Sequence, residues 1–486
     1  MTRWWSVDPL GAGVAALVAV LALAPGLLPR DGIVQGVVSG GVAALGYGSG
    51  AALPGSRRGG RVVALVGLLG FGVALVVAAG RQRDAAALIG APGPTTGEFL
   101  LALPVTVAVV GVLVVVGRGF RGLTRLVRRW LGARLPGAAV LVVALGTVLV
   151  VGALGWGALA AAEQSFAARN DEPGPVAAPA SATRSGSPAS LVPWETLGRD
   201  GRRFVGGAGD TVRVYVGLES APDPQARAAL AVAELERAGG FDRSVLVLAT
   251  PTGSGAVDPQ VPGSLERVRG GDTAMAAVQY STLPSDLSLL VDGPRAAEQT
   301  RALVDAVRAR LDRRPPERRP RLLLYGQSLG ALGSQAAFTS LDEVRSRVDG
   351  VLWVGPPHAS EPWAGLVAGR DPGSPQVRPV VDGGRAVRFA GRAGDLATPA
   401  GPWDTPRVLY LQHPSDPVVW WSPDLLRRRP DRLAEPPGFD VPGQPWLPVI
   451  TFWATTVDLA RAQSVPPDHG HLYDALLVDG WMAVAR

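Results

Sequence analysis

The sequence predicts a chain in two parts: an N-terminal all-α transmembrane helical domain and a C-terminal α/β domain whose mostly parallel sheet is flanked by helices. Three observations predict this. Long apolar runs are concentrated before about residue 162, a stretch rich in Pro, Ala, Ser and Gly follows, and short apolar runs then alternate with helix-like segments. We therefore expect a helical domain over residues 1–165, a linker over 166–193 and an α/β domain over 194–486.

The first part contains five apolar stretches, each close to the roughly 20 residues that a helix needs to cross about 30 Å of hydrocarbon. A cleaved signal peptide would account for the first stretch alone. The sequence therefore predicts a multi-pass protein of the cell membrane, with about five spans, at residues 10–28, 33–53, 62–79, 99–117 and 138–162.

Arginine placement predicts the orientation, because loops that flank membrane spans keep their positive charge in the cytoplasm. With the N-terminus inside, most of the flanking arginines lie inside, and only Arg30, Arg81 and Arg83 lie outside. An odd number of spans then places the C-terminal domain outside the cytoplasm, whereas a count of four would reverse its side.

The formal charge of +6 does not indicate a nucleic-acid partner. Much of the excess lies in residues 118–134, a basic amphipathic stretch that suits anionic membrane lipids. No basic module with interleaved aromatic residues is present, so we expect no nucleic-acid binding. The chain has no cysteine, which excludes disulfides and thiolate metal sites. We expect neither a cofactor nor a metal.

The linker contains the sequence DEPGPVAAPASATRSGSPAS, which offers little apolar surface to bury. Such a segment is typical of a flexible tether.

The C-terminal part alternates between two kinds of segment. Short apolar runs bounded by helices imply a mostly parallel sheet covered on both faces, and such sheets bind ligands at the carboxyl ends of their strands. We expect helices over 225–238 and 295–311, and strands over 212–218, 244–249, 276–280, 322–325, 350–354, 386–389 and 408–412.

A serine lies at the end of the strand over 322–325. The sequence Gly326-Gln-Ser-Leu-Gly330 joins this strand to an Ala-rich helical segment, and it matches the sharp turn that exposes a nucleophilic serine. Ser328 is therefore the candidate nucleophile.

An aspartate and a pair of histidines follow later in the chain. Asp416 comes just after the strand RVLYLQ, where a carboxylate that orients an imidazole belongs, although a Ser-Asp-Pro turn has the same composition. His469 and His471 lie in a loop near the C-terminus, and the order Ser, Asp, His is that of the α/β-hydrolases. Both histidines are candidates for the base; Gly470 before it and an apolar residue after it favour His471.

Acyl transfer also needs an oxyanion hole. The amide of Leu329, directly after the nucleophile, is one expected donor. The second would come from the glycine-containing loop after the strand VLVLA, at Thr252 or Gly253. A plain turn is the alternative interpretation of that loop.

These segments together resemble the actinobacterial membrane-anchored α/β-hydrolases, which join a multi-span N-terminal domain to a catalytic domain. The resemblance covers nearly the whole chain and implies an α/β-hydrolase fold with a triad of Ser328, Asp416 and one of the two late histidines. A Gly commonly precedes the first of those histidines in the family, where this chain has Asp468. The matching segments are TPTGSGAVDP, QYSTLPSDLSLLVD, YGQSLG, HPSDPVVWWSPDLL, PVITFWATTVDL and HGHLY.

Two adjacent tryptophans, Trp420 and Trp421, follow the aspartate turn. They are predicted to line an acyl pocket or to face the bilayer, because indoles favour both places. The sequence thus predicts a serine esterase or lipase, or an acyltransferase, acting on a lipid or cell-envelope ester. It does not separate hydrolysis from transfer, and it does not predict an oligomeric state.

Two other functions fit the sequence less well. A transporter or scaffold with a non-catalytic hydrolase-like domain is the alternative, but no ionisable residue lies at mid-span, where transport of polar solutes would need one. An intramembrane protease built on Ser49 lacks a partner base, because no histidine precedes His358.

Overall fold

The computed structural model describes residues 7–53, 60–130, 146, 164–172, 174–207, 209–284, 287–288 and 291–485. The chain divides into two compact units. The first, here called the helical unit, comprises residues 1–159 and 421–466, and the second, the sheet unit, comprises residues 160–420 and 467–486.

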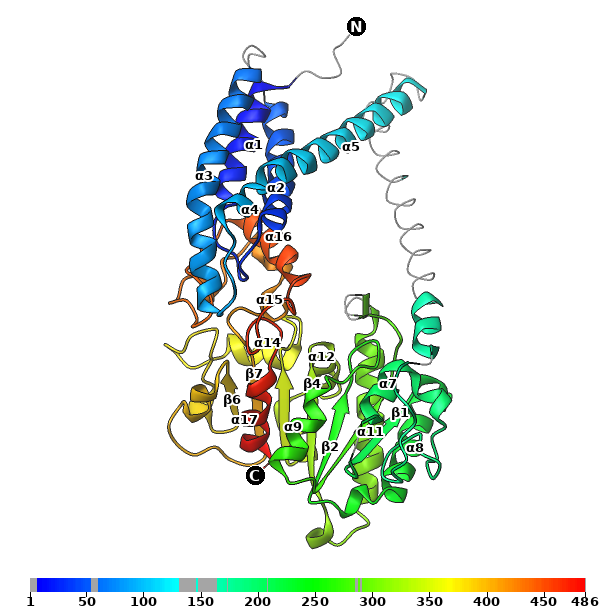
Figure 1. Cartoon of the computed structure of the whole chain (residues 1–486). Coiled ribbons are helices and arrows are strands. Elements are labelled where there is room, and N and C mark those ends of the chain that lie inside the picture. The colour runs from blue at the N-terminus through cyan, green and yellow to red at the C-terminus, as the bar shows by residue number, and fades with distance from the viewer. Residues whose placement is uncertain are drawn as a thin grey trace. The chain divides into compact units, whose positions relative to one another are not determined.

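The sheet unit is built on seven strands, and every neighbouring pair is parallel. Every residue of the two strands at 245–250 and 273–278 is buried, which explains why they are continuous apolar runs rather than alternating ones. This sheet confirms the predicted α/β fold of the C-terminal part (Figure 1). In spatial order the strands are β1 (Val212–Val216), β3 (Thr273–Val278), β2 (Val245–Thr250), β4 (Arg321–Gln327), β5 (Gly350–Val354), β7 (Arg407–Leu411) and β6 (Val387–Ala390).

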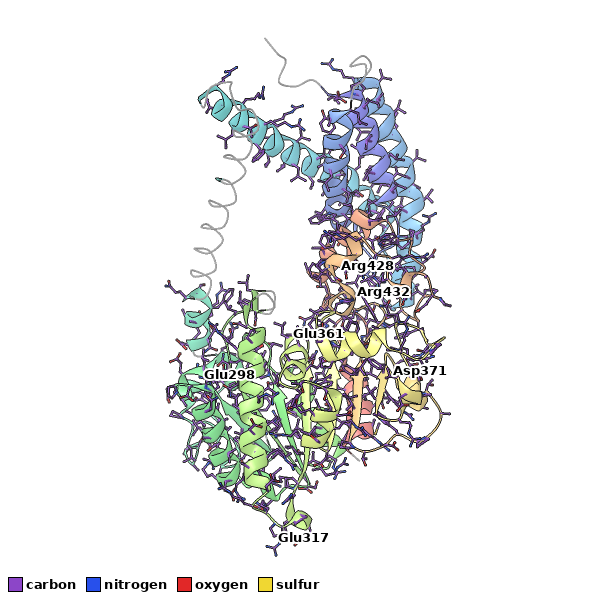
Figure 2. The ribbon with its side chains drawn as sticks, turned by 180° about the vertical axis from the view of Figure 1, so that it is seen from behind. Glu298, Glu317, Glu361, Asp371, Arg428 and Arg432 are labelled. Atoms are coloured by element: carbon purple, nitrogen blue, oxygen red, sulfur yellow. The ribbon has the colours of Figure 1, made fainter. Side chains whose placement is uncertain are left out.

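Helices cover the sheet in two groups. One packs together α8 (Pro224–Arg237), α11 (Gly293–Leu311) and α12 (Leu329–Ala336), and the other packs α9 (Gln260–Val268) against α17 (Asp474–Val484). The predicted helices over 225–238 and 295–311 correspond to α8 and α11. Charged side chains such as Glu298 and Glu317 remain on the outer surface (Figure 2). Shorter helices are α7 (Gly198–Val205), α13 (Leu341–Arg347), α14 (Glu361–Ala368) and α15 (Pro417–Trp420).

The second half of the predicted linker is not a tether. Ser185 and Val192 are fully buried, and the backbone of Arg184 forms an isolated parallel β-bridge with Arg213 of β1. The buried Glu234 carboxylate of α8 accepts hydrogen bonds from the Ser190 hydroxyl at 2.7 Å and the Leu191 amide at 2.9 Å. The prediction was wrong here because hydrogen bonds from a distant helix order a segment whose own composition favours disorder.

The helical unit contains α1 (Pro9–Leu21), α2 (Gly32–Ala52), α3 (Gly60–Leu88), α4 (Thr96–Leu100) and α5 (Ala102–Trp130). The first four predicted spans overlap α1, α2, α3 and α5, and the fifth, 138–162, lies outside the described residues except for residue 146. Within the described part, the helices over Arg61–Leu88 and Thr96–Leu126 are long and apolar enough to cross a membrane.

Glycines bring α1 and α2 close together. A Cβ on Gly11 would lie 2.9 Å from the Tyr47 carbonyl, and one on Gly50 would lie 2.7 Å from the Leu10 carbonyl. Small residues allow this backbone approach, which is a common device in helix pairs of membrane proteins.

The segment 421–466 belongs to the helical unit, although the sequence assigned it to the catalytic domain. Its helix α16 (Pro448–Leu459) packs on α2, where Ala454 is buried together with Ala22, Val38 and Val42. The apolar face of α16 explains why the segment lies outside the predicted domain, because an apolar face must be covered by a second apolar surface, here that of α2.

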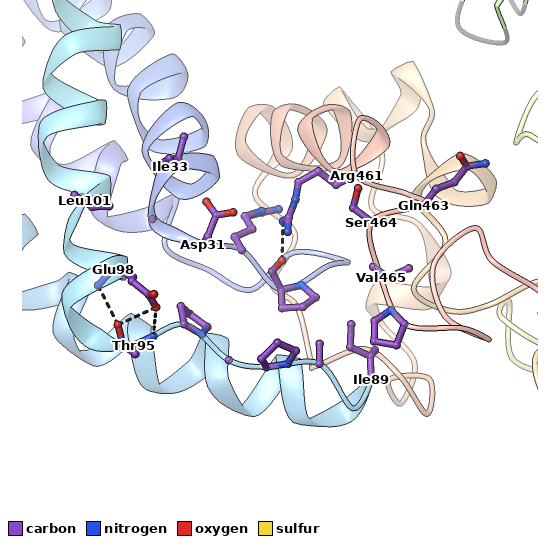
Figure 3. A pocket seen from close by; sticks show the side chains of 18 residues that line it. Asp31, Ile33, Ile89, Thr95, Glu98, Leu101, Arg461, Gln463, Ser464 and Val465 are labelled. Carbon is purple, nitrogen blue, oxygen red and sulfur yellow. Dashed lines mark hydrogen bonds between the residues drawn. The ribbon is translucent and has the colours of Figure 1, made fainter.

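A pocket of about 930 Å³ lies within the helical unit. Asp31 and Ile33 at the start of α2, and Thr95 and Glu98 around α4, line one part of it, and residues 461 and 463–466 line another (Figure 3).

Candidate active site

Ser328 lies between the last residue of β4 and the first residue of α12. Its backbone has φ 55° and ψ −123°, a conformation that residues other than glycine rarely adopt. The Ser328 amide donates to the Val354 carbonyl at the end of β5, at 2.9 Å. This strained strand-to-helix turn is the geometry of a nucleophile elbow.

The flanking glycines are required by close backbone contacts. A Cβ on Gly326 would lie 2.4 Å from the Gly330 carbonyl oxygen, and a Cβ on Gly330 would lie 2.2 Å from the Thr250 carbonyl oxygen. The elbow therefore packs directly against the end of β2, the strand whose following loop contains Thr252 and Gly253.

Asp416 and His471 form a buried pair. Asp416, just before α15, is fully buried, and His471 is 3% exposed. The His471 Nδ1 lies 2.7 Å from Asp416 Oδ2 and donates to it, which leaves the other ring nitrogen, Nε2, as the acceptor. Among the described residues, Nε2 has no hydrogen-bond partner.

Two further hydrogen bonds hold the Asp416 carboxylate. The Tyr473 hydroxyl donates to Oδ2 at 2.7 Å, and the Val418 amide donates to Oδ1 at 2.9 Å. The Tyr473 oxygen also accepts the His413 amide at 3.2 Å, and the two rings stack with centroids 4.2 Å apart. The carboxylate is thus fixed on both oxygens, and His413 packs behind it.

The loops that carry Asp416 and His471 are also bonded to each other. The Gly470 amide donates to the Ser415 hydroxyl at 2.8 Å, and His413 Nδ1 lies 2.9 Å from the Gly470 carbonyl. Gly470 has φ 53°, so glycine suits the turn that precedes His471.

Ser328 and His471 converge at the end of β5. The Ser328 amide is bonded to Val354, and a Cβ on the next residue, Gly355, would lie 2.6 Å from the His471 ring. His471 Nε2 does not hydrogen bond to Ser328 in this structure. Catalytic hydrogen bonds are often long before substrate binds. The arrangement provides a hydroxyl in a strained turn beside an imidazole with a free acceptor nitrogen.

Comparison with known proteins identifies the family of the chain. A model of the alpha/beta-hydrolase family matches residues 212–486, more than half of the chain. The chain belongs to the alpha/beta-hydrolase family. A second model, of the N-terminus found in that family, matches residues 23–208. No curated protein matches the chain, and no solved structure does.

In this alpha/beta-hydrolase, His469 lies apart from the Asp416 carboxylate oxygens, which are held by His471, Tyr473 and Val418. Its half-buried ring lies 6.4 Å from that of His413, centroid to centroid. The preceding Asp468 accepts the Leu476 amide of α17 at 3.1 Å. The geometry favours His471 as the base.

The two candidate oxyanion donors after β2 differ in their hydrogen bonds. The Thr252 amide donates to the Ala256 carbonyl at 2.9 Å, within a turn. The Gly253 amide has no hydrogen bond to any described residue. Leu329 is the first residue of α12 and directly follows Ser328. Gly253 is therefore the stronger candidate to complete the pair with Leu329.

The two adjacent tryptophans do not act as a pair. Trp420 is 2% exposed, packs edge-on against Trp363, and donates its indole N–H to the His413 carbonyl at 2.9 Å. Trp421 belongs to the helical unit, where its indole donates to Thr456 at 2.8 Å. Trp420 therefore supports the aspartate loop from within the core and does not face a bilayer.

Sequence reasoning missed Tyr473, His413 and Gly355. Tyr473 was within reach, because it lies two residues after His471 in the segment HGHLY, but no local pattern shows that its hydroxyl contacts Asp416. Within the described residues, no group of three or more His, Asp or Glu side chains could hold a metal ion.

Proposed function

We propose that this alpha/beta-hydrolase is a membrane-anchored serine hydrolase of the esterase or lipase type, which cleaves or transfers acyl esters through Ser328, Asp416 and His471. The observation that carries the proposal is the buried Asp416–His471 pair, whose free Nε2 lies at the same strand end as the strained serine.

The chemistry follows from these positions. His471 Nε2 accepts the Ser328 proton as the hydroxyl oxygen attacks the ester carbonyl, and the Asp416 carboxylate stabilises the imidazolium that forms. The amides of Leu329 and Gly253 stabilise the oxyanion. His471 then returns the proton to the leaving alcohol, and an acyl-enzyme remains on Ser328. Water completes hydrolysis, and an acceptor alcohol completes transfer.

Exposed apolar helices support the membrane anchor. Val73 on α3 is 70% exposed and Val112 on α5 is 64% exposed, and both belong to long rows of exposed Val and Leu side chains. Contiguous apolar surface of this extent is unfavourable in water and suits a bilayer. An enzyme held at a membrane meets lipid and cell-envelope esters at high local concentration, so we propose an ester of apolar character as substrate.

The arginine distribution supports an extracytoplasmic catalytic domain. A reporter enzyme that is active only outside the cytoplasm, fused after Arg486, is expected to be active. Activity of a cytoplasm-specific reporter at the same site would reverse the orientation.

The triad is tested with a fluorophosphonate probe on the full-length chain in detergent. The wild type is expected to be labelled and Ser328→Ala unlabelled. A panel of esters of increasing acyl length then defines the substrate class. Unchanged labelling of Ser328→Ala would remove this serine from the mechanism, and a folded wild type that is neither labelled nor active on any ester would favour a non-catalytic binding module.

A further inference from the structure

Asp416 and His471 are the two residues that would assist Ser328, and the chain leaves the sheet unit at a point between them in the sequence. It passes into the helical unit directly after Trp420, at the end of the short helix that follows Asp416, and returns at Pro467, just before His471. Residues 421–466, here called the docked segment, therefore connect the loop of the carboxylate to the loop of the imidazole.

A buried ion pair anchors the docked segment within the helical unit. The Arg30 Nε and Nη2 atoms lie 3.1 and 3.0 Å from the two Asp458 carboxylate oxygens, and neither side chain is exposed. The Leu27 amide also donates to Asp458 Oδ2, at 3.1 Å. Arg30 lies between α1 and α2, and Asp458 lies in the last turn of α16, so the pair joins segments distant in sequence.

Apolar and backbone contacts surround this ion pair. Trp453 of α16 packs so closely on α2 that a Cβ on Gly41 would lie 2.5 Å from its indole nitrogen. Beyond the helix, Arg461 donates to the Pro29 carbonyl at 2.7 Å (Figure 3). The docked segment is thus held from α16 almost to the residue where it re-enters the sheet unit.

The residues that flank the docked segment on either side are bonded to the same loop of the sheet unit, residues 413–416. Trp420 donates to His413, and Gly470 is bonded to both His413 and Ser415. A displacement of residues 459–466 would therefore be transmitted to the loop of His471, because few residues separate the anchor from that loop.

We propose that the helical unit keeps the catalytic carboxylate and imidazole in position through the docked segment, with Arg30 and Asp458 as positioning residues. This inference rests on the proposed function. Loss of one partner leaves a buried charge unpaired, which is far more damaging than replacing both partners by apolar groups of similar volume. A single variant that leaves one charge unpaired therefore tests the loss of the anchor. A double variant with apolar residues at both positions tests whether the anchor needs its charges.

The test compares full-length variants in detergent. Asp458→Asn is expected to lower kcat on a short, water-soluble ester by about tenfold or more, to leave KM nearly unchanged, and to slow fluorophosphonate labelling of Ser328 in proportion. Hydrogen exchange is expected to accelerate in residues 448–459 and also in residues 467–473. The double variant Arg30→Met, Asp458→Leu is expected to restore both exchange rates and kcat.

Glu266→Gln is the matched control, because it breaks an Arg213–Glu266 ion pair of 2.7 Å that lies wholly in the sheet unit. It should leave kcat and the exchange of residues 467–473 unchanged. The inference is wrong if Asp458→Asn accelerates hydrogen exchange in residues 448–459 but changes neither kcat nor the exchange of residues 467–473. It is also wrong if exchange accelerates in neither region. A wild type without esterase activity or labelling would refute the proposed function alone, since the exchange measurements still decide whether the anchor controls the His471 loop.

Discussion

Among single residues, the Asp416 carboxylate distinguishes the two candidate histidines, because it is bonded to His471. Its two oxygens have three partners, the Val418 amide, the Tyr473 hydroxyl and His471 Nδ1. A carboxylate held on both sides fixes the tautomer and the direction of the imidazole that it contacts. The sequence left two histidines open because both lie in one loop, and only the turn at Gly470 directs His471 toward Asp416.

Replacing each histidine singly by Ala tests this assignment. His471→Ala is expected to lower kcat on a chromogenic ester by several orders of magnitude, because it removes the proposed acceptor of the Ser328 proton. His469→Ala is expected to lower it by less than about tenfold, since the ring does not bind the carboxylate. A larger loss in the His469 variant, with His471→Ala still active, would reverse the roles.

Tyr473→Phe removes one hydrogen bond from the Asp416 carboxylate and keeps the aromatic ring stacked on His413. A hydrogen bond to a charged group contributes about 1.5–3 kcal/mol, so kcat is expected to fall about tenfold and the melting temperature slightly. Tyr410→Phe is the control, because its buried hydroxyl donates to Gln335 at 2.8 Å away from the carboxylate. It should lower the melting temperature without changing kcat. Equal kcat losses in both variants would show a general packing effect.

Among elements, the strands were the most predictable part of the molecule. β5 was expected over 350–354 and spans Gly350–Val354, because a short apolar run of this length is typical of a strand buried on both faces. The elbow at Ser328 was predictable for a similar reason, since its two glycines are a local steric requirement. Signals of this kind lie within a few residues of the feature that they specify.

Elements held by distant contacts were not predictable. Residues 185–192 resemble a linker in composition, and the Glu234 carboxylate that orders them lies in α8. α16 resembles any amphipathic helix of the catalytic domain, and its partner α2 lies near the other end of the chain. The local sequence predicts neither the contact of residues 185–192 with Glu234 nor the packing of α16 on α2. Each contact depends on a partner surface that is distant in sequence.

Glu234→Gln tests the ordering of residues 185–192. Burial raises the pKa of this carboxyl, but hydrogen bonds from Arg237, Ser190 and the Leu191 amide outweigh burial and leave the pKa lowered. The folded pKa is then below the unfolded one, so the stabilisation is present at neutral pH and is lost as the pH falls below about 4.5. The variant is expected to be less stable at pH 7 by about 2 kcal/mol, and the difference should narrow toward pH 3.

The matched control is Glu236→Gln in the same helix, which breaks an exposed pair with Arg310. It should change stability by less than about 0.5 kcal/mol. Thermal unfolding followed from pH 3 to pH 7 measures both variants. A Glu234→Gln difference that does not vary with pH would mean that the carboxylate charge is not what orders this segment.

For the whole molecule, the boundary between the two units does not coincide with a single point in the sequence. The helical unit takes residues 421–466 from the half of the chain that contains the sheet. Two family models divide the chain near residue 210, yet the structure crosses that division with α16 and its ion pair. The two halves are therefore expected to fold as one protein rather than as separable domains.

A chain that begins at residue 166 tests this expectation. It lacks α2 and Arg30, so Ile450, Trp453 and Val457 lose the apolar surface that they pack on, and the buried Asp458 loses its partner. An uncovered apolar face with an unpaired charge beside it favours association. We expect this chain to aggregate or to require detergent in size-exclusion chromatography, and co-expression of residues 1–165 to restore a soluble complex in detergent with full labelling of Ser328. A truncated chain that is monomeric without detergent and labelled at the wild-type rate would show that the sheet unit is self-sufficient and that α16 is only an attachment.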